Sequence, residues 1–145
     1  NLVDFKAIVE EQKKLNPFWF DDEADALAVE NDIVSAERQL GLSFPEKYRG
    51  FLREFGGGYF AFTNVFSVDI DGAWYICEKN QEAKSYLPDN FLAISDDETG
   101  GFYGYVVTKG ECNEAIYYWD HESNSIEDKM FEDIFEYIVT IGLSD

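Results

Sequence analysis

The chain has few of the residues that build covalent or metal-bound frameworks. Its 145 residues include two Cys, three Pro and a single His. Cys77 and Cys112 alone make neither a disulfide framework nor a metal site, so we expect reduced thiols in a reducing, cytoplasmic compartment. The lone His121 supplies no two-histidine zinc site, and the chain lacks the elbow and oxyanion signals of a Ser-His-Asp triad. We therefore expect neither a metal nor a catalytic site.

Long apolar runs are also missing. No window reaches the roughly 20 apolar residues of a membrane span. In residues 1–14, charged side chains interrupt every apolar pair, so this segment has no signal-peptide core. The sequence therefore predicts no membrane-inserted segment.

Basic residues are scarce. Eleven Lys and Arg stand against thirty Asp and Glu, which gives a formal net charge of −19. Seven acidic residues gather within residues 21–37 and nine within residues 111–136, where Lys129 is the only Lys or Arg. Such clusters repel nucleic-acid phosphates and anionic membranes, and they attract a basic partner. The alternative is that an acidic surface only keeps the protein in solution.

Aromatic residues, in contrast, are abundant. The chain has 13 Phe, 9 Tyr and 3 Trp, and 46% of its residues are hydrophobic, which excludes intrinsic disorder. A chain of this length fits one domain, residues 1–145, which buries about 69% of its unfolded surface. We therefore expect a single domain with a sizeable core.

Residues 33–58 have the pattern of a helical hairpin. An apolar stripe with the spacing i, i+3, i+4 and i+7 consists of Tyr48, Phe51, Leu52 and Phe55. Gly41 and Gly56 stand where left-handed C-terminal caps usually fall. Ser43 and Glu46 have the spacing of a capping box. We predict two amphipathic helices that each bury one face.

Two more helices are expected at the ends of the chain. The range 2–15 has Phe5, Ile8 and Val9 on one side, and the range 126–141 has a broad apolar stripe. Asn31 or Asp32 can cap the helix that follows the acidic run.

After Gly58 the pattern changes to that of strands and turns. Aromatic and β-branched residues predict strands over 59–69, 73–78, 91–95, 102–108 and 115–119. Asp71-Gly72 predicts a tight hairpin between residues 67–70 and 73–77, and Lys109-Gly110 predicts a second turn. Helices first, then an antiparallel meander, then a closing helix imply an α+β fold with helices packed on one sheet face.

Two glycine-containing segments resemble ligand loops but lack the required spacing. Residues 96–101, Asp-Asp-Glu-Thr-Gly-Gly, do not have the alternating ligands of an EF-hand, so a polar turn is the better interpretation. The three glycines at 56–58 follow a helix instead of preceding one, which argues against a phosphate cradle. We expect no bound cofactor.

The strand aromatics predict a binding surface. Successive side chains of a strand point to opposite faces, so one set of rings must face away from the core. Aromatic anchors with an acidic rim suit a basic protein partner. The predicted partner-binding residues are Asp69, Asp71, Trp74, Asp96, Asp97, Glu98, Tyr103, Tyr118, Asp120 and Glu122. The alternative is that a second helix or a homodimer partner covers this face.

Several motifs, in order, resemble those of the SUKH superfamily. The motifs are Glu37-Arg38-Gln39-Leu40-Gly41, Phe44-Pro45-Glu46-Lys47-Tyr48, Phe51-Leu52, Phe55-Gly56-Gly57, Leu87-Pro88-Asp89 with residues 91–95, Gly100-Gly101, Asp120-His121-Glu122 and residues 131–138. One departure is Phe44, where the superfamily more typically has Leu, and the residue stays apolar. The superfamily includes yeast cell-wall-assembly regulators and bacterial immunity proteins against polymorphic toxins.

The resemblance implies a small, cytoplasmic, non-enzymatic binding protein. It suggests an immunity protein, monomeric or homodimeric, that neutralises a cognate toxin, often a basic nuclease, by stoichiometric occlusion. The alternative is an intracellular scaffold or regulatory module without a toxin, as the fungal members suggest. A hydrolytic enzyme would need a buried carboxylate pair in a deep pocket.

Overall fold

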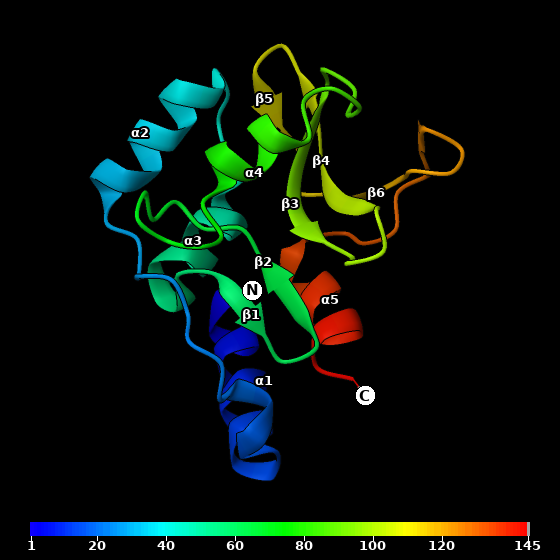
Figure 1. Cartoon of the computed structure of the whole chain (residues 1–145). Helices are drawn as coiled ribbons and strands as arrows, with labels where there is room; N and C mark the ends of the chain where they lie inside the picture. The colour runs from blue at the N-terminus through cyan, green and yellow to red at the C-terminus, as the bar shows by residue number, and fades with distance from the viewer. Residues whose placement is uncertain (145) are drawn as a thin grey trace.

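The protein combines antiparallel sheets with helices that lie around them (Figure 1). The computed structural model describes residues 1–144. In chain order the elements are α1 (Leu2–Leu15), η1 (Pro17–Phe20), α2 (Glu30–Leu40), α3 (Glu46–Phe55), β1 (Gly58–Phe60), β2 (Thr63–Val65), α4 (Ile76–Glu82), β3 (Phe91–Asp96), β4 (Phe102–Thr108), β5 (Glu111–Cys112), β6 (Tyr117–Asp120), β7 (Ser125–Ile126), α5 (Ile134–Tyr137) and the π-helical turn η2 (Ile138–Gly142). The predicted α+β class is confirmed. Within residues 1–144, every helix is too short or too polar to cross a membrane.

The larger sheet is the predicted antiparallel meander. Its strand order is β3-β4-β6-β7, and β5 pairs with the end of β4 across the predicted Lys109-Gly110 turn. Phe102 of β4 lies between its partners Asp96 of β3 and Trp119 of β6. The β1–β2 hairpin lies beside β3, as shown in Figure 1. The five-stranded sheet and the two-stranded hairpin therefore lie side by side.

Different elements cover the two faces of this sheet. Alternation along β4 points Tyr105 and Phe102 to opposite faces. The ring of Tyr105 lies 6.0 Å from that of Tyr48 on α3. On the other face, Tyr86 from the segment after α4 stacks on Phe102 and Trp119 at 6.4 and 5.7 Å. The core therefore lies between α3 and the sheet, with aromatic packing on both sides.

The helical hairpin formed as predicted. α2 buries Ile33 and Ala36, and Asp32 accepts a hydrogen bond from the backbone at the start of its own helix. Gly41 (φ 71°) and Gly56 (φ 82°) end the two helices with positive φ angles. α3 buries its apolar stripe, Tyr48, Phe51 and Leu52, with Phe55 partly buried.

The predicted capping box between Ser43 and Glu46 is wrong. α3 begins at Glu46 without a side-chain cap, and Ser43 donates its N–H to Gly110 O at 2.8 Å. The next N–H, that of Phe44, donates to Glu37 Oε2 of α2 at 2.6 Å. Contacts with distant residues therefore replace the local cap.

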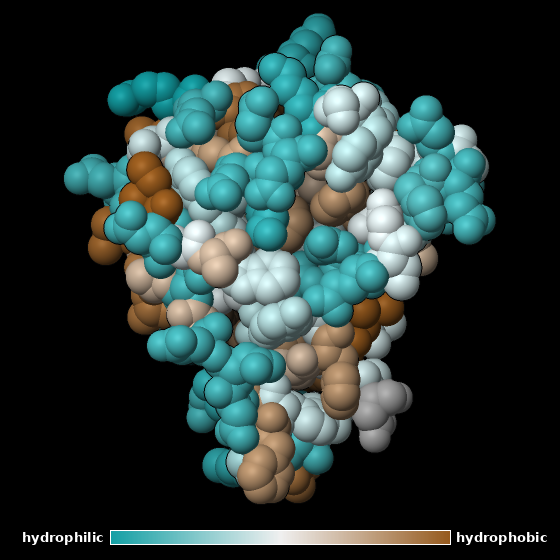
Figure 2. Space-filling view, in the orientation of Figure 1, coloured by the Kyte–Doolittle hydropathy of each residue, from teal (hydrophilic) through white to brown (hydrophobic). Residues whose placement is uncertain are grey.

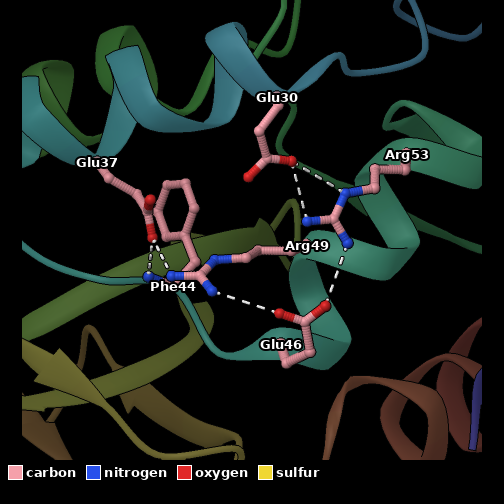
Figure 3. Close-up of polar contacts among 6 residues, drawn as sticks. All are labelled: Glu30, Glu37, Phe44, Glu46, Arg49 and Arg53. Atoms are coloured by element: carbon pink, nitrogen blue, oxygen red, sulfur yellow. Dashed lines mark hydrogen bonds and ion pairs between the residues drawn. The ribbon is translucent and has the colours of Figure 1, made fainter.

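A network of ion pairs joins α2 to α3 (Figure 3). Arg49 Nη2 lies 2.8 Å from Glu37 Oε2, and Arg53 Nη2 lies 3.1 Å from Glu30 Oε2. Both arginines also reach Glu46, at 3.3 and 3.1 Å, and these contacts lower the pKa of the Glu46 carboxyl. The two arginines are thus used internally to hold the hairpin together.

The predicted hairpin over residues 67–77 is wrong. Ser67 and Tyr75 form a single parallel bridge, and α4 begins directly after Tyr75. Asp25 Oδ2 accepts hydrogen bonds from Ser67 Oγ (2.6 Å) and from Trp74 N–H (3.0 Å). Because a distant carboxylate takes the Trp74 amide, that N–H does not enter a hairpin ladder.

The final helix is shorter than the predicted range 126–141. Ile126 belongs to β7, and Phe131 forms an antiparallel bridge with Ile116. The helix begins only after Asp133, whose carboxylate accepts a backbone N–H of the first turn at 2.9 Å. The apolar residues before Asp133 are therefore held by strand-like pairing.

Two further details differ from the prediction. The range 59–69 does not form one strand, because the chain turns at Ala61 (φ 52°) and splits into β1 and β2. Ile8 lies on the outer side of α1 and is 40% exposed.

Two asparagine side chains bind the backbone of β3 on the side that faces β2 and α4. Asn80 Nδ2 donates to Ala93 O at 2.9 Å, and its Oδ1 accepts from Ala93 N–H at 3.0 Å. In the same way, Asn64 Nδ2 donates to Asp96 O at 2.7 Å, and Asn64 Oδ1 accepts from Asp96 N–H at 2.8 Å. Each amide replaces the pair of hydrogen bonds that a neighbouring strand would make, so β3 presents few unpaired backbone groups.

Candidate partner-binding surface

The ten residues predicted to bind a partner come from four stretches of the chain, and we refer to them as the acidic–aromatic surface. They are Asp69, Asp71 and Trp74 before α4, Asp96, Asp97 and Glu98 at the end of β3, Tyr103 in β4, and Tyr118, Asp120 and Glu122 in and after β6. Asp71, Glu98 and Glu122 are exposed, and the other seven are half-buried.

Tyr59, which the sequence reasoning missed, connects two of these stretches. Its ring lies 4.9 Å from that of Trp74 in an edge-to-face arrangement. Its hydroxyl donates to Glu98 Oε1 at 2.9 Å, and the side chain is 44% exposed. The signal that would have found it is the alternation in β1, where Tyr59 stands between two buried residues.

Backbone amides hold the acidic turn after β3 in a fixed shape. Asp96 Oδ1 accepts from Glu98 N–H at 2.7 Å, and Asp97 Oδ1 accepts from Thr99 and Gly101 N–H at 2.8 and 2.9 Å. Burial alone would raise the pKa of Asp97. The hydrogen bonds that its carboxylate accepts from the Tyr118 hydroxyl and from the Thr99 and Gly101 amides outweigh burial, so the pKa is lowered. The segment is thus the predicted polar turn, and Asp97 is held in its charged form.

Tyr103 and Tyr118 are less exposed than predicted. Their rings lie 4.9 Å apart, and Tyr103 also lies 4.7 Å from Tyr137 of α5. The hydroxyl of Tyr118 donates to Asp97 Oδ2. This face of the sheet is therefore partly covered by α5, and the two rings support the acidic turn more than they project into solvent.

The turn after β6 lies beside the acidic turn. Asp120 accepts hydrogen bonds from Glu122 N–H and Ser123 Oγ at 3.2 and 3.0 Å. The exposed ring of His121 lies over Gly100, because a Cβ on that glycine would lie 3.0 Å from His121 Nδ1. The two turns thus meet through His121 and Gly100, and Asp120 and Glu122 flank His121 in the sequence.

Among residues 1–144, the carboxylates of this surface form no ion pairs with Lys, Arg or His. Ion pairs among the described residues use Lys6, Lys13, Lys47, Arg49, Arg53 and Lys129, and none of the seven carboxylates of the acidic–aromatic surface takes part. Lys79 Nζ lies 5.1 Å from the centre of the Trp74 ring, where it makes a cation–π contact. In Figure 2, hydrophilic side chains surround a pale patch over β1 and β2, and strongly apolar ones lie mainly toward the edges of the view.

The described part of the chain has at least two cavities. The first, which we call the ring-lined pocket, has a volume of about 200 Å³ and is lined by Tyr59, Phe62, Thr63, Asn64, Asp96, Asp97, Glu98, Tyr103, Tyr137 and Ile141. The second, of about 410 Å³, lies between α2, α4 and β3 and includes Gln39, Asn80 and Lys84. Of these two, only the ring-lined pocket is formed by residues of the acidic–aromatic surface.

The structure offers little for covalent or metal chemistry. Within residues 1–144, no three His, Cys, Asp or Glu side chains are arranged to hold a metal ion. Cys77 and Cys112 are free thiols, and burial raises the pKa of Cys112 to about 11. At neutral pH both thiols are protonated and therefore weak nucleophiles.

Comparisons with known proteins agree with this architecture. The model of the SUKH_6 family, described as SMI1-KNR4 cell-wall, matches residues 30–138. A crystal structure of a protein from Pseudomonas syringae pv. tomato is similar, with a TM-score of 0.71 and 17% identity over 97% of this chain and 99% of that one. At this identity the similarity shows the fold alone. No curated protein matches the chain.

Proposed function

Because this chain belongs to the SUKH family, we propose that it is an immunity protein that binds a cognate toxin protein and blocks it by occupying its active surface. The observation that carries the proposal is the unpaired charge of the acidic–aromatic surface. Its seven carboxylates make no ion pair among the described residues. Tyr59, which contacts Trp74 and donates a hydrogen bond to Glu98, adds a partly exposed aromatic anchor. Such a surface suits a partner that brings its own positive charges.

The proposed partner is a basic nuclease domain. A nuclease carries cations that hold nucleic-acid phosphate, and carboxylates on this surface would occupy the same cations. The net charge of −19 attracts such a partner and speeds the encounter. It repels nucleic acid and anionic membranes, so neither is a partner in this proposal. Inhibition is stoichiometric, without catalysis, metal or cofactor.

Several features of the proposal concern the whole molecule. We assign residues 1–145 to one SUKH domain, of which the family model covers residues 30–138. The protein acts in the cytoplasm, as a monomer or a homodimer.

Co-expression with the protein encoded by each neighbouring gene tests the proposal. If one of those proteins stops growth, this chain restores growth, and the two purify as a complex of fixed stoichiometry. A failure of every neighbouring gene product to bind would overturn the immunity function. It would favour the second candidate, an intracellular scaffold, to which the cell-wall description of the family model points.

A charge-matched pair of variants tests the surface. Asp71→Asn, Glu98→Gln and Glu122→Gln together remove three exposed charges from the acidic–aromatic surface. A control with Glu11→Gln, Glu82→Gln and Asp89→Asn removes three exposed charges elsewhere. We expect stopped-flow association with the toxin at low salt to slow about tenfold in the first variant and less than about twofold in the control. Equal slowing, or an on-rate that does not depend on salt, would contradict the proposed surface.

A further inference from the structure

The ring-lined pocket has an unusual combination of walls. Aromatic side chains form its sides, Thr63 and Asn64 contribute polar groups, and Asp96, Asp97 and Glu98 line it with carboxylates. All of its lining residues are neutral or acidic. At about 200 Å³ it is smaller than the roughly 300–1,000 Å³ of typical small-molecule sites. A single side chain of a partner is therefore a better fit than a free metabolite.

Two carboxylates of the pocket keep an oxygen available. Asp96 uses Oδ1 to accept Glu98 N–H, and Glu98 uses Oε1 to accept the Tyr59 hydroxyl. In the part of the chain that the structure describes, Asp96 Oδ2 and Glu98 Oε2 accept no hydrogen bond. Both oxygens of Asp97, in contrast, already accept hydrogen bonds. Its Oδ1 accepts from two backbone amides, and its Oδ2 accepts from the Tyr118 hydroxyl. The pocket therefore offers two free acceptor oxygens on side chains that are already fixed by hydrogen bonds. A ligand can bind them without rearranging these side chains.

The chemistry of these walls selects among cations. A guanidinium is planar, donates from several N–H groups to separate carboxylate oxygens, and stacks on aromatic faces. The rings of Tyr59, Phe62 and Tyr103 line the same pocket as the two free oxygens. A lysine ammonium is a compact, strongly hydrated charge that gains less from flat aromatic walls. We infer that the ring-lined pocket receives the guanidinium of one arginine side chain of the partner, an inference that rests on the proposed binding of a basic protein.

Titration with small probes tests this pocket directly. The probes are N-acetyl-arginine amide, its neutral isostere N-acetyl-citrulline amide, and N-acetyl-lysine amide, each followed by two-dimensional ¹H–¹⁵N NMR. The arginine probe should shift the signals of residues 59–63 and 96–101 in a saturable way, and the lysine probe should bind more weakly. Citrulline should cause no shift there. Equal shifts from citrulline, or arginine shifts spread over every acidic segment, would overturn the inference.

Two variants locate the contact. Asp96→Asn with Glu98→Gln keeps the Oδ1 acceptor for the turn and removes both charges, and we expect it to weaken the arginine probe about five- to tenfold. Glu78→Gln with Glu82→Gln removes two exposed charges on α4 and should change the affinity by less than about twofold. Tyr59→Leu should weaken arginine more than lysine, because it removes a stacking face. The same loss in the control pair would show that general electrostatics, and not the pocket, hold the probe.

The outcomes separate this inference from the proposed function. If arginine binds as expected but no neighbouring gene product does, the pocket stands and the immunity function fails. If a toxin binds the Asp96→Asn, Glu98→Gln protein as tightly as the unaltered protein, the immunity function stands and the arginine anchor is refuted.

Discussion

Replacement of Glu37 by Ala should destabilise the protein strongly, because one carboxylate there serves two donors. Glu37 Oε2 accepts the Phe44 N–H at 2.6 Å and Arg49 Nη2 at 2.8 Å, and the side chain is only 15% exposed. Hydrogen bonds to charged groups contribute about 1.5–3 kcal/mol each. Water reaches Arg49, which also keeps Glu46, so we take the lower value for both bonds and expect a loss of about 3 kcal/mol. For a domain of this size the melting temperature should fall by roughly 6–12 °C.

Glu30 provides the matched control for this prediction. It lies on the same helix and contacts one arginine, Arg53, but its side chain is 64% exposed. Exposed pairs contribute about 0.2–1 kcal/mol, so Glu30→Ala should lose no more than about 1 kcal/mol even with its favourable place at the helix N-terminus. Urea unfolding followed by tryptophan fluorescence measures both variants. Equal losses, or a loss below about 1 kcal/mol for Glu37→Ala, would refute the assigned role of Glu37.

Three further predictions concern the glycines that end α2 and α3, the two thiols, and Asp97 in the acidic turn after β3. Gly41→Ala should lower the free energy of unfolding by about 1–2 kcal/mol, because its φ angle is positive. Gly56→Ala should lower it clearly more, because the added Cβ would also lie 2.3 Å from a backbone carbonyl oxygen. Equal losses in equilibrium unfolding would contradict this. Cys77 and Cys112 should react slowly with Ellman's reagent at pH 8 and rapidly in denaturant, since burial raises the pKa of both thiols; rapid reaction of the folded protein would contradict this. The stability that Asp97 contributes through its lowered pKa is present above about pH 4 and lost as pH falls through the folded-state value, so Asp97→Asn should flatten the acid side of the stability curve; an unchanged acid limb would show that the carboxylate is not stabilised.

The elements that could be predicted are those whose pattern is local. The stripe around Tyr48 and Phe51 repeats with the helical period, and Gly41 marks the end of the preceding helix, so the hairpin follows from the sequence. The wrong predictions share one cause, which is contacts between residues that lie far apart in the sequence. Trp74 lies in a strand-like run, but its amide is bound by Asp25, 49 positions away. Phe131 has helical spacing, but its backbone pairs with a strand segment.

The candidate surface stays a prediction, and only some of the contacts among its residues could be anticipated from the sequence. The cluster of Asp96, Asp97 and Glu98 is visible in the sequence, because three acids precede a glycine turn. Alternation along its strand could have indicated that Tyr59 faces outward, but its contacts with Trp74 and Glu98, which are remote in the chain, could not be read from the sequence. Alternation also cannot say which sheet face a helix will cover, so the sequence did not show that α5 would partly cover Tyr103.

The side-chain amides of Asn64 and Asn80 limit one way in which another protein could attach to this fold. Their hydrogen bonds to Asp96 and Ala93 leave little of the β3 main chain on that side free to pair with a strand from another protein, so strand addition is disfavoured there.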